Sequence, residues 1–300
     1  MSGSLHALSR PLVVDLDGTL IRTDLLVESA SQFLIQHPFQ CFKPLLWLLR
    51  GKAVLKTELA HRVQLDASAL PYNSDLLDWL RAEKQSGRRL VLATASHRVL
   101  AEQVAQHLHL FDEVLATEGD TNLKSTAKAN ALVARFGESG FDYVGNDWPD
   151  LQVWAKAHTA HVVDASASLL SRAQAQGHVG QVFDSGLPPS WQAMLKAMRL
   201  HQWMKNLLVF VPLMAAHQYA DAPRDVLALM AFVVFSLTAS SVYLLNDLVD
   251  VQDDRHHARK RHRPFASGAL SLVTGWMVWP LLLLVAVVLS VLFMPVLFSV

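Results

Sequence analysis

The sequence has little cysteine and little charge. Cys41 is the only cysteine, so an intrachain disulfide is excluded, which fits a reducing compartment. Asp, Glu, Lys and Arg make up 17% of the 300 residues, whereas about 25% is typical of soluble domains. The formal net charge is zero, so nothing indicates nucleic acid as a partner. Residues 1–10 lack the apolar core of a secretory signal, and we expect the first half of the chain to be cytoplasmic.

The missing charge is concentrated in the second half of the chain. Val226–Leu245 runs for 20 residues without a charge and Leu272–Val300 for 29, and about 18–20 apolar residues suffice to cross a bilayer as a helix. We therefore expect a soluble α/β domain at 11–185 and a membrane domain at 190–300. Its first three spans are predicted at about 200–220, 226–246 and 272–295, although the first could instead lie along the membrane surface.

A short apolar run, Pro11–Val14, leads into two aspartates, Asp15 and Asp17. Alternation places both carboxylates on one side of the strand end, about 6–7 Å apart. Such a pair repels unless a hard cation such as Mg²⁺ lies beside it. One carboxylate could then attack phosphorus while the other protonates the leaving oxygen. The alternative is an ordinary turn.

The string VVDLDGTL resembles the first motif of the haloacid dehalogenase superfamily. The resemblance implies an α/β Rossmann-like phosphatase domain that depends on Mg²⁺, with Asp15 as nucleophile and Asp17 as general acid and base. A second strand, Arg89–Ala93, precedes the hydroxyl that the superfamily uses to bind the phosphoryl group. Thr94 is the best match for that hydroxyl, and Ser96 is the alternative.

The third and fourth motifs of the superfamily also have counterparts. Lys128 stands at the start of a helical stretch and would neutralise the nucleophile and the phosphate, with Lys124 as the alternative. In the fourth motif, Asn146 replaces the usual first aspartate and Asp150 matches the second, while Asp147 could compensate for the lost charge. The resemblance thus implies a Mg²⁺ site made by Asp15, Asp17, Asn146 and Asp150.

The helical stretch between the first two motifs, about 21–88, matches the position of a cap over the active site. Such a cap excludes water and selects substrates. Within it, Phe39–Arg50 is unusually apolar. This segment is either the core of the cap or a patch that faces a membrane and a lipid-linked substrate.

The second predicted span runs directly into a cluster of aspartates. In a continuous helix, Asp247, Asp250 and Asp254 would share one face. Like charges there are tolerable around Mg²⁺ ions that bridge a diphosphate. The basic run Arg259–Arg263 follows and could hold further phosphate oxygens. The alternative is a solvated cytoplasmic loop that follows the positive-inside rule.

This order of span, aspartates and basic residues resembles the UbiA-type intramembrane prenyltransferases. The resemblance implies an all-α transmembrane segment that binds a diphosphate through Mg²⁺. By position, the implied metal ligands are Asp247, Asp250 and Asp254. The implied substrate-binding residues are Lys205, Asn206, Asn246, Lys260 and Arg263.

The order of the two domains is similar to that in proteins related to decaprenyl-phosphate phosphoribosyltransferase. It implies a bifunctional protein, in which the membrane half joins a polyprenyl phosphate to phosphoribosyl diphosphate and the soluble half removes the phosphate from the product. Two alternatives are prenylation of an aromatic ring, as in quinone or haem pathways, and a membrane-anchored phosphatase whose truncated membrane half is not catalytic. The expected partners are a polyprenyl phosphate or diphosphate lipid, a phosphorylated small molecule and the lipid bilayer. The expected location is a bacterial-type inner membrane, with the phosphatase domain in the cytoplasm.

Overall fold

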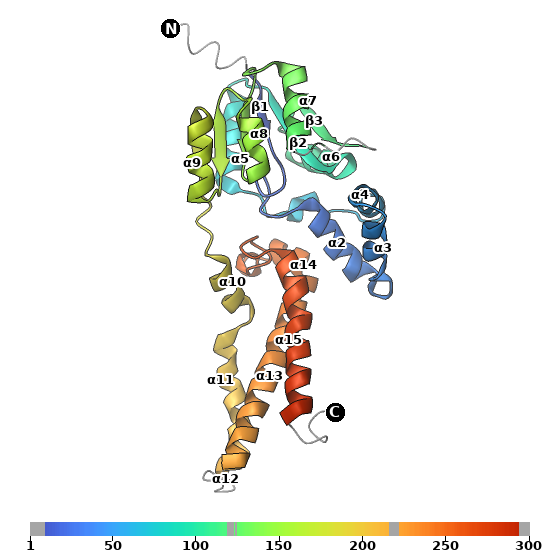
Figure 1. The fold of residues 1–300 in the computed structure, drawn as a ribbon, viewed down its shortest axis with the longest axis vertical. Helices are drawn as coiled ribbons and strands as arrows, with labels where there is room; N and C mark the ends of the chain where they lie inside the picture. Colours follow the sequence, from blue (N-terminus) through green and yellow to red (C-terminus); the bar gives the residue numbers. More distant parts are fainter. Residues whose placement is uncertain (1–9, 119–122, 124, 216–221, 294–300) are drawn as a thin grey trace. The chain divides into compact units, whose positions relative to one another are not determined.

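The computed structural model describes residues 10–118, 123, 125–215 and 222–293. The chain divides into two compact units, residues 1–187 and residues 188–300. Figure 1 traces both along the sequence. Each unit is described by itself below.

The first unit is built on a six-stranded parallel sheet with the strand order β3-β2-β1-β4-β5-β6. The chain adds β2 and β3 on one side of β1 and then moves to the other side for β4, so the order reverses beside β1. Open α/β sheets bind ligands at such a reversal, outside the carboxyl ends of the strands. The strands are β1 (Leu12–Val14), β2 (Leu90–His97), β3 (Glu113–Thr117), β4 (Asp142–Gly145), β5 (Ala160–Val163) and β6 (Val179–Phe183).

Both faces of this sheet are covered, which explains why its central strands are apolar throughout. Leu12 and Val14 point to one face, where α5 (Ser74–Gln85) and α6 (Arg98–Leu108) pack. Val13 points to the other face, against α7 (Thr126–Phe136), α8 (Leu151–Trp154) and α9 (Ala167–Gln176). The result is a three-layer α/β/α arrangement, which confirms the predicted Rossmann-like fold class.

A separate group of helices follows β1 and forms the cap. It has its own core, in which Phe33 and Trp47 pack against Leu55, Leu59 and Val63. The sequence analysis extended the cap to residue 88, but α5 buries Leu76, Leu77 and Leu80 in the core beneath the sheet. The helices of the cap are α2 (Leu25–Gln36), η1 (Pro38–Gln40), α3 (Lys43–Leu49) and α4 (Lys52–Ala60), followed by η2 (Ala67–Ala69).

The second unit contains two long apolar helices, α13 (Ala222–Val249) and α15 (Leu272–Phe293). Among the described residues, these are the two helices long and apolar enough to cross a membrane. Large side chains such as Leu284 and Leu292 are exposed on α15, as expected of a surface that faces lipid rather than water. Pro280 lies within α15. Shorter elements around these helices are α10 (Ser190–Ala197), α14 (Val251–His256) and η6 (Lys260–His262).

The region of the first predicted span forms a series of short segments over its described part. They are η4 (Leu200–Gln202), α11 (Trp203–Asn206), η5 (Leu207–Phe210) and α12 (Val211–Ala215). This series packs against α13, because Trp203 Nε1 donates to Ser240 Oγ at 3.0 Å and Asn206 Nδ2 donates to Ser236 Oγ at 2.9 Å. Residues 216–221 lie outside the described part, so a continuous span at 200–220 stays a prediction.

A glycine allows the loop between the two long helices to pack closely on α15. The ring of Phe265 is buried, and a Cβ at Gly275 would lie 2.6 Å from two of its ring carbons. Leu248 of α13 reaches the same point. The absence of a side chain at Gly275 therefore lets α13, α15 and the loop before α15 pack together at one point.

Candidate functional site

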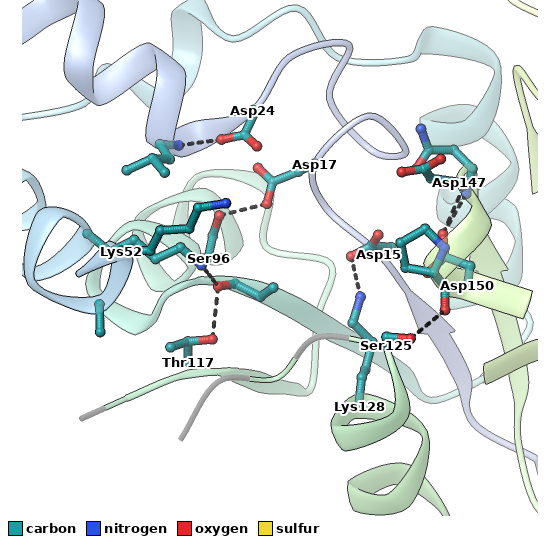
Figure 2. A pocket seen from close by; sticks show the side chains of 16 residues that line it. Asp15, Asp17, Asp24, Lys52, Ser96, Thr117, Ser125, Lys128, Asp147 and Asp150 are labelled. Atoms are coloured by element: carbon teal, nitrogen blue, oxygen red, sulfur yellow. Dashed lines mark hydrogen bonds and ion pairs between the residues drawn. The ribbon is translucent and has the colours of Figure 1, made fainter. Parts of the chain in front are cut away.

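A cavity of about 330 Å³ lies at the carboxyl edge of the sheet, in the first unit. Its lining comes from the ends of β1 to β4 and from the cap helices α2 and α4. This is the edge where the strand order reverses, and the two sides of the cavity can be followed in Figure 2. The polar lining residues are Asp15, Asp17, Asp24, Lys52, Lys56, Ser96, Thr117, Ser125, Lys128, Asn146, Asp147 and Asp150.

On one side of the cavity, a chain of buried polar contacts begins at Asp15. Lys128, in the first turn of α7, donates from Nζ to Asp15 Oδ1 at 2.8 Å and to the Tyr143 hydroxyl at 3.0 Å. Tyr143 in turn donates to Asp150 Oδ1 at 2.9 Å. Three sequence-predicted residues are thus brought together. Tyr143 was missed, because a tyrosine inside an apolar strand looks like core. Lys124, the alternative to Lys128, lies outside the described residues.

Burial sets the electrostatics of this chain. It raises the pKa of Asp15 to about 7, with Asp150 and Asp17 adding to the rise and Lys128 opposing it. Burial acts to lower the pKa of Lys128, but the carboxylates of Asp15 and Asp150 outweigh it and raise that pKa above its usual value. Lys128 is therefore a buried cation paired with the Asp15 carboxyl group, whose pKa is raised by burial.

On the other side of the cavity, Asp17 accepts hydrogen bonds at both carboxylate oxygens. Leu25 N, at the start of α2, donates to Oδ1 at 2.8 Å. Ser96 Oγ and Thr94 Oγ1 donate to Oδ2 at 2.6 and 3.2 Å. Burial raises the pKa of Asp17 to about 6, and the charge of Asp24 adds to the rise, while these hydrogen bonds oppose it.

The two candidate hydroxyls on β2 lie at different depths. Thr94 is fully buried beneath Asp17 and also accepts from Ser96 N at 2.9 Å. Ser96 lines the cavity. The structure therefore favours Ser96, the alternative of the sequence analysis, as the hydroxyl that a ligand in the cavity would meet.

The fourth motif forms a tight turn after β4. Asp150 Oδ2 accepts from the backbone N–H groups of Asn146 and Asp147 at 2.9 and 3.1 Å. This turn needs Gly145, since a Cβ there would lie 2.6 Å from Asp150 Oδ2. Asn146 Oδ1 accepts from Thr19 Oγ1 at 3.1 Å, and Asn146 lines the cavity.

The oxygen atoms at this edge have the chemistry that Mg²⁺ prefers. Asp15 and Asn146 offer carboxylate and amide oxygens to the cavity. Asp17 fits less well, because both its oxygens are engaged. Within the described ranges, no three His, Cys, Asp or Glu side chains are grouped to hold a metal ion, so a metal here would depend on Asn146 as well.

Two lysines of the cap also reach the cavity, and the sequence analysis did not single them out. Lys52 and Lys56 lie on α4 and line the side nearest to Ser96. Lys56 Nζ donates to Ala95 O at 2.6 Å. A signal was present in the sequence, since residues 29–57 contain no Asp or Glu. These lysines give the mouth of the cavity the charge expected for an anionic ligand.

In the second unit, two buried aspartates share an arginine. Arg263 Nη1 lies 3.1 Å from Asp247 Oδ1 and 2.7 Å from Asp254 Oδ2. Arg199, missed by the sequence analysis, lies 2.6 Å from Asp247 Oδ1, and Lys260 Nζ lies 3.5 Å from Asp254 Oδ1. We call these five residues the aspartate–arginine cluster. Its carboxylates suit Mg²⁺ by type, although cations neutralise them in this structure.

The remaining predicted residues of the second unit lie apart from this cluster or at its border. α13 ends at Val249, so Asp250 stands half-buried at the break before α14, and Asn246 is exposed. Asn206 contacts Ser236, which is about 16 Å along the helix axis from Asp247. Lys205, next to Asn206, is exposed. The structure does not bring Lys205 and Asn206 to the aspartates.

Comparisons with known proteins agree with this division. The haloacid dehalogenase-like hydrolase model matches residues 46–145, and the UbiA prenyltransferase family model matches residues 206–300. A Sinorhizobium fredii protein named y4nM is 34% identical over 267 residues, which is 89% of this chain and 52% of that protein. The decaprenyl-phosphate phosphoribosyltransferase of Mycolicibacterium smegmatis is 47% identical over 100 residues, covering 31% of this chain and 30% of that enzyme.

This chain thus spans about half the length of the first relative and under a third of the second. Among solved structures, a substrate-bound phosphoserine phosphatase is similar over 58% of this chain and 92% of its own, with 13% identity and a TM-score of 0.39. From the family matches and the fold, the chain consists of a haloacid dehalogenase-like hydrolase domain followed by a region of the UbiA prenyltransferase family.

Proposed function

We propose that the first unit, about residues 11–185, hydrolyses phosphate monoesters with Asp15 as the nucleophile. The observation that carries this proposal is the Asp15 carboxyl group, which lines the cavity and lies 2.8 Å from the buried Lys128 ammonium. A carboxylate so placed can attack phosphorus while the lysine offsets the charge of the phosphoryl oxygens.

The reaction would proceed in two displacements. Asp15 forms a bond to phosphorus as the ester P–O bond breaks, and Asp17 gives its proton to the leaving oxygen. Asp17 then removes a proton from water, which attacks the same phosphorus and releases inorganic phosphate and the Asp15 carboxylate. The pKa of Asp17, raised to about 6 by burial, keeps it able to give and take this proton near neutral pH.

Ser96 and the cap lysines would hold the substrate during these steps. Ser96 Oγ lies at the cavity wall next to Asp17, and Lys52 and Lys56 face the same space from α4. When bound, Mg²⁺ would supply positive charge next to the attacked phosphate. Asp15 and Asn146 are the residues that would hold it, with Asp150 fixing the turn around Asn146.

The test is hydrolysis of p-nitrophenyl phosphate by the full chain in detergent, with and without Mg²⁺. Asp15→Asn should lower turnover by at least about 100-fold, because an amide is a poor nucleophile. Asp78→Asn is the matched control, since Asp78 belongs to α5 and its side chain is 74% exposed. Equal activity of the two variants would rule out Asp15 as the nucleophile.

We further propose that the second unit, about residues 190–300, binds the phosphate groups of a polyprenyl phosphate or diphosphate at the aspartate–arginine cluster. Arg199, Arg263 and Lys260 supply cationic donors, and Asp247 and Asp254 supply oxygens that Mg²⁺ could join to the phosphates. The similarity to decaprenyl-phosphate phosphoribosyltransferases supports this substrate class. Asp250 and Asn246 border the cluster and would join it on binding.

The placement of the protein follows from the same elements. α13 and α15 would cross a bacterial-type inner membrane, and the loop between them carries five Lys and Arg residues, whereas Arg224 is the basic residue at the other end of α13. The positive-inside rule then puts that loop in the cytoplasm, and the first predicted span, at about 200–220, would put the first unit on the same side.

A two-step reaction would connect the units. The transferase joins a polyprenyl phosphate to phosphoribosyl diphosphate with loss of pyrophosphate, and the phosphatase then removes the remaining phosphate from the lipid-linked sugar. Membranes carrying the protein, incubated with both substrates, test this order. Asp250→Ala should abolish lipid–sugar formation, whereas Asp15→Asn should accumulate its phosphorylated form. Product formed only with a prenyl diphosphate and an aromatic acid would favour ring prenylation instead.

A further inference from the structure

The cap carries an exposed apolar surface that its own core does not use. In the helix α3, Trp47 packs into the cap core, while its neighbours turn outward. Phe39 is 95% exposed and Leu49 is 77% exposed. We call this surface the α3 patch. It consists of Phe39, Phe42, Leu45, Leu46, Leu48 and Leu49.

The charged residues next to the α3 patch along the chain are all of one sign. Lys43, Arg50 and Lys52 flank the apolar side chains, and no Asp or Glu occurs between Glu28 and Glu58. A partner that covers the patch should therefore be apolar inside and anionic at its border. The interface of a bilayer with anionic headgroups has this composition, and each Lys or Arg near such a surface strengthens partitioning by about fivefold.

The chain itself tethers the first unit to a membrane. α13 and α15 are long and apolar enough to cross one. Residues 184–189 connect β6 to α10, and six residues can extend to only about 20 Å. A second copy of the chain would bring the same basic border against itself, so like charges oppose self-association through this surface.

We propose that the α3 patch inserts into the headgroup and acyl boundary of an anionic bilayer, as a contact of the cap that is separate from the membrane spans. Apolar side chains flanked by lysine and arginine enter this boundary to a depth of about 5–10 Å. α4 follows α3 after two residues and carries Lys52 and Lys56 at the cavity. A phosphate borne by a lipid at this surface would therefore meet the cap on its way to Asp15.

Cys41 makes the test direct, because it is the only thiol of the chain and is exposed between η1 and α3. A nitrobenzoxadiazole fluorophore on Cys41 is followed with the full chain reconstituted in vesicles of phosphatidylcholine and phosphatidylglycerol. Doxyl-labelled phospholipids should quench this emission, and lowering the phosphatidylglycerol content or raising the salt should weaken the quenching. Leu45→Ser with Leu49→Ser should weaken partitioning by about tenfold or more for each leucine.

The matched control carries Cys41→Ser and Glu138→Cys, with the same fluorophore on the exposed turn between α7 and β4, at the amino edge of the sheet. Its emission should not respond to the doxyl lipids. The proposal is overturned if the Cys41 label escapes lipid quenching, if the Glu138→Cys label is quenched equally, or if energy transfer between labelled copies replaces lipid quenching. The readout is membrane contact rather than turnover, so its failure would leave the proposed phosphatase activity untouched.

Discussion

The Tyr143 hydroxyl should hold the charged groups of Lys128 and Asp150 together. It donates to Asp150 Oδ1 at 2.9 Å and accepts from Lys128 Nζ at 3.0 Å, and Tyr143 is fully buried. Tyr143→Phe removes this hydroxyl and keeps the ring that packs in the core. Lys128 and Asp150 then each lose one hydrogen-bond partner at a buried position.

The expected cost follows from these contacts. A hydrogen bond to a charged group contributes roughly 1.5–3 kcal/mol. Lys128 keeps Asp15, and Asp150 keeps its two backbone donors, so the loss should stay near the lower end for each. We expect a decrease of about 3 kcal/mol in the free energy of unfolding, or roughly 10 °C in the Tm of a domain of this size. Turnover should also fall by about tenfold, because Lys128 is held less firmly.

Tyr72→Phe is the matched control, because the Tyr72 hydroxyl donates to the neutral carbonyl oxygen of Ala67 at 2.8 Å. It should cost about 1 kcal/mol. Both variants are compared in detergent by calorimetry of the first unit and by hydrolysis of p-nitrophenyl phosphate. If Tyr143→Phe costs no more than Tyr72→Phe, the hydroxyl does not bridge the two charges and the reasoning fails.

Three further variants test other parts of the structure. Arg263→Ala leaves two buried aspartates short of a cation, so it should destabilise the second unit by about 3–5 kcal/mol in thermal unfolding, whereas Arg261→Ala on the exposed side should have little effect. Burial lowers the pKa of His161 to about 4, from about 6.5 in the unfolded chain, so the unfolded chain binds more protons between these two pH values. The free energy of unfolding should therefore be complete above pH 6.5 and fall by roughly 3 kcal/mol towards pH 4, and urea titrations of His161→Gln should lack this decrease. Asn146→Asp adds a charged oxygen ligand, so half-maximal phosphatase activity should need about tenfold less Mg²⁺, and an unchanged requirement would exclude position 146 from the metal site.

The sequence was sufficient to predict the sheet edge and its charged residues. Strongly apolar strands ending in polar residues can form only a buried parallel sheet with its polar groups at one edge, and motif resemblance paired Asp15 with Lys128 across 113 positions. The choice between Thr94 and Ser96 could not be made. Thr94 and Ser96 are two residues apart, so strand alternation places both hydroxyls on the same side, and both reach Asp17.

The aspartates of the second unit were located in part. Helical spacing assumed one continuous helix, but α13 ends before Asp250, which stands at the N-terminal end of α14 without a side-chain capping hydrogen bond. Asp247 and Asp254 still meet at Arg263, because the break is short. Arg199 comes from a segment almost 50 residues earlier, and a contact of that range leaves no periodic signal in a single sequence.

The contact at Gly275 has a mechanical consequence for the aspartate–arginine cluster. Phe265 stands two residues after Arg263, and its buried ring packs at Gly275 of α15, where Leu248 of α13 also reaches. The backbone at Arg263 is therefore held in place by the packing of the two helices and does not move as a free loop would. A lipid headgroup could displace the aspartates from this guanidinium in two ways. Either the Arg263 side chain rotates by itself, or the two helices separate.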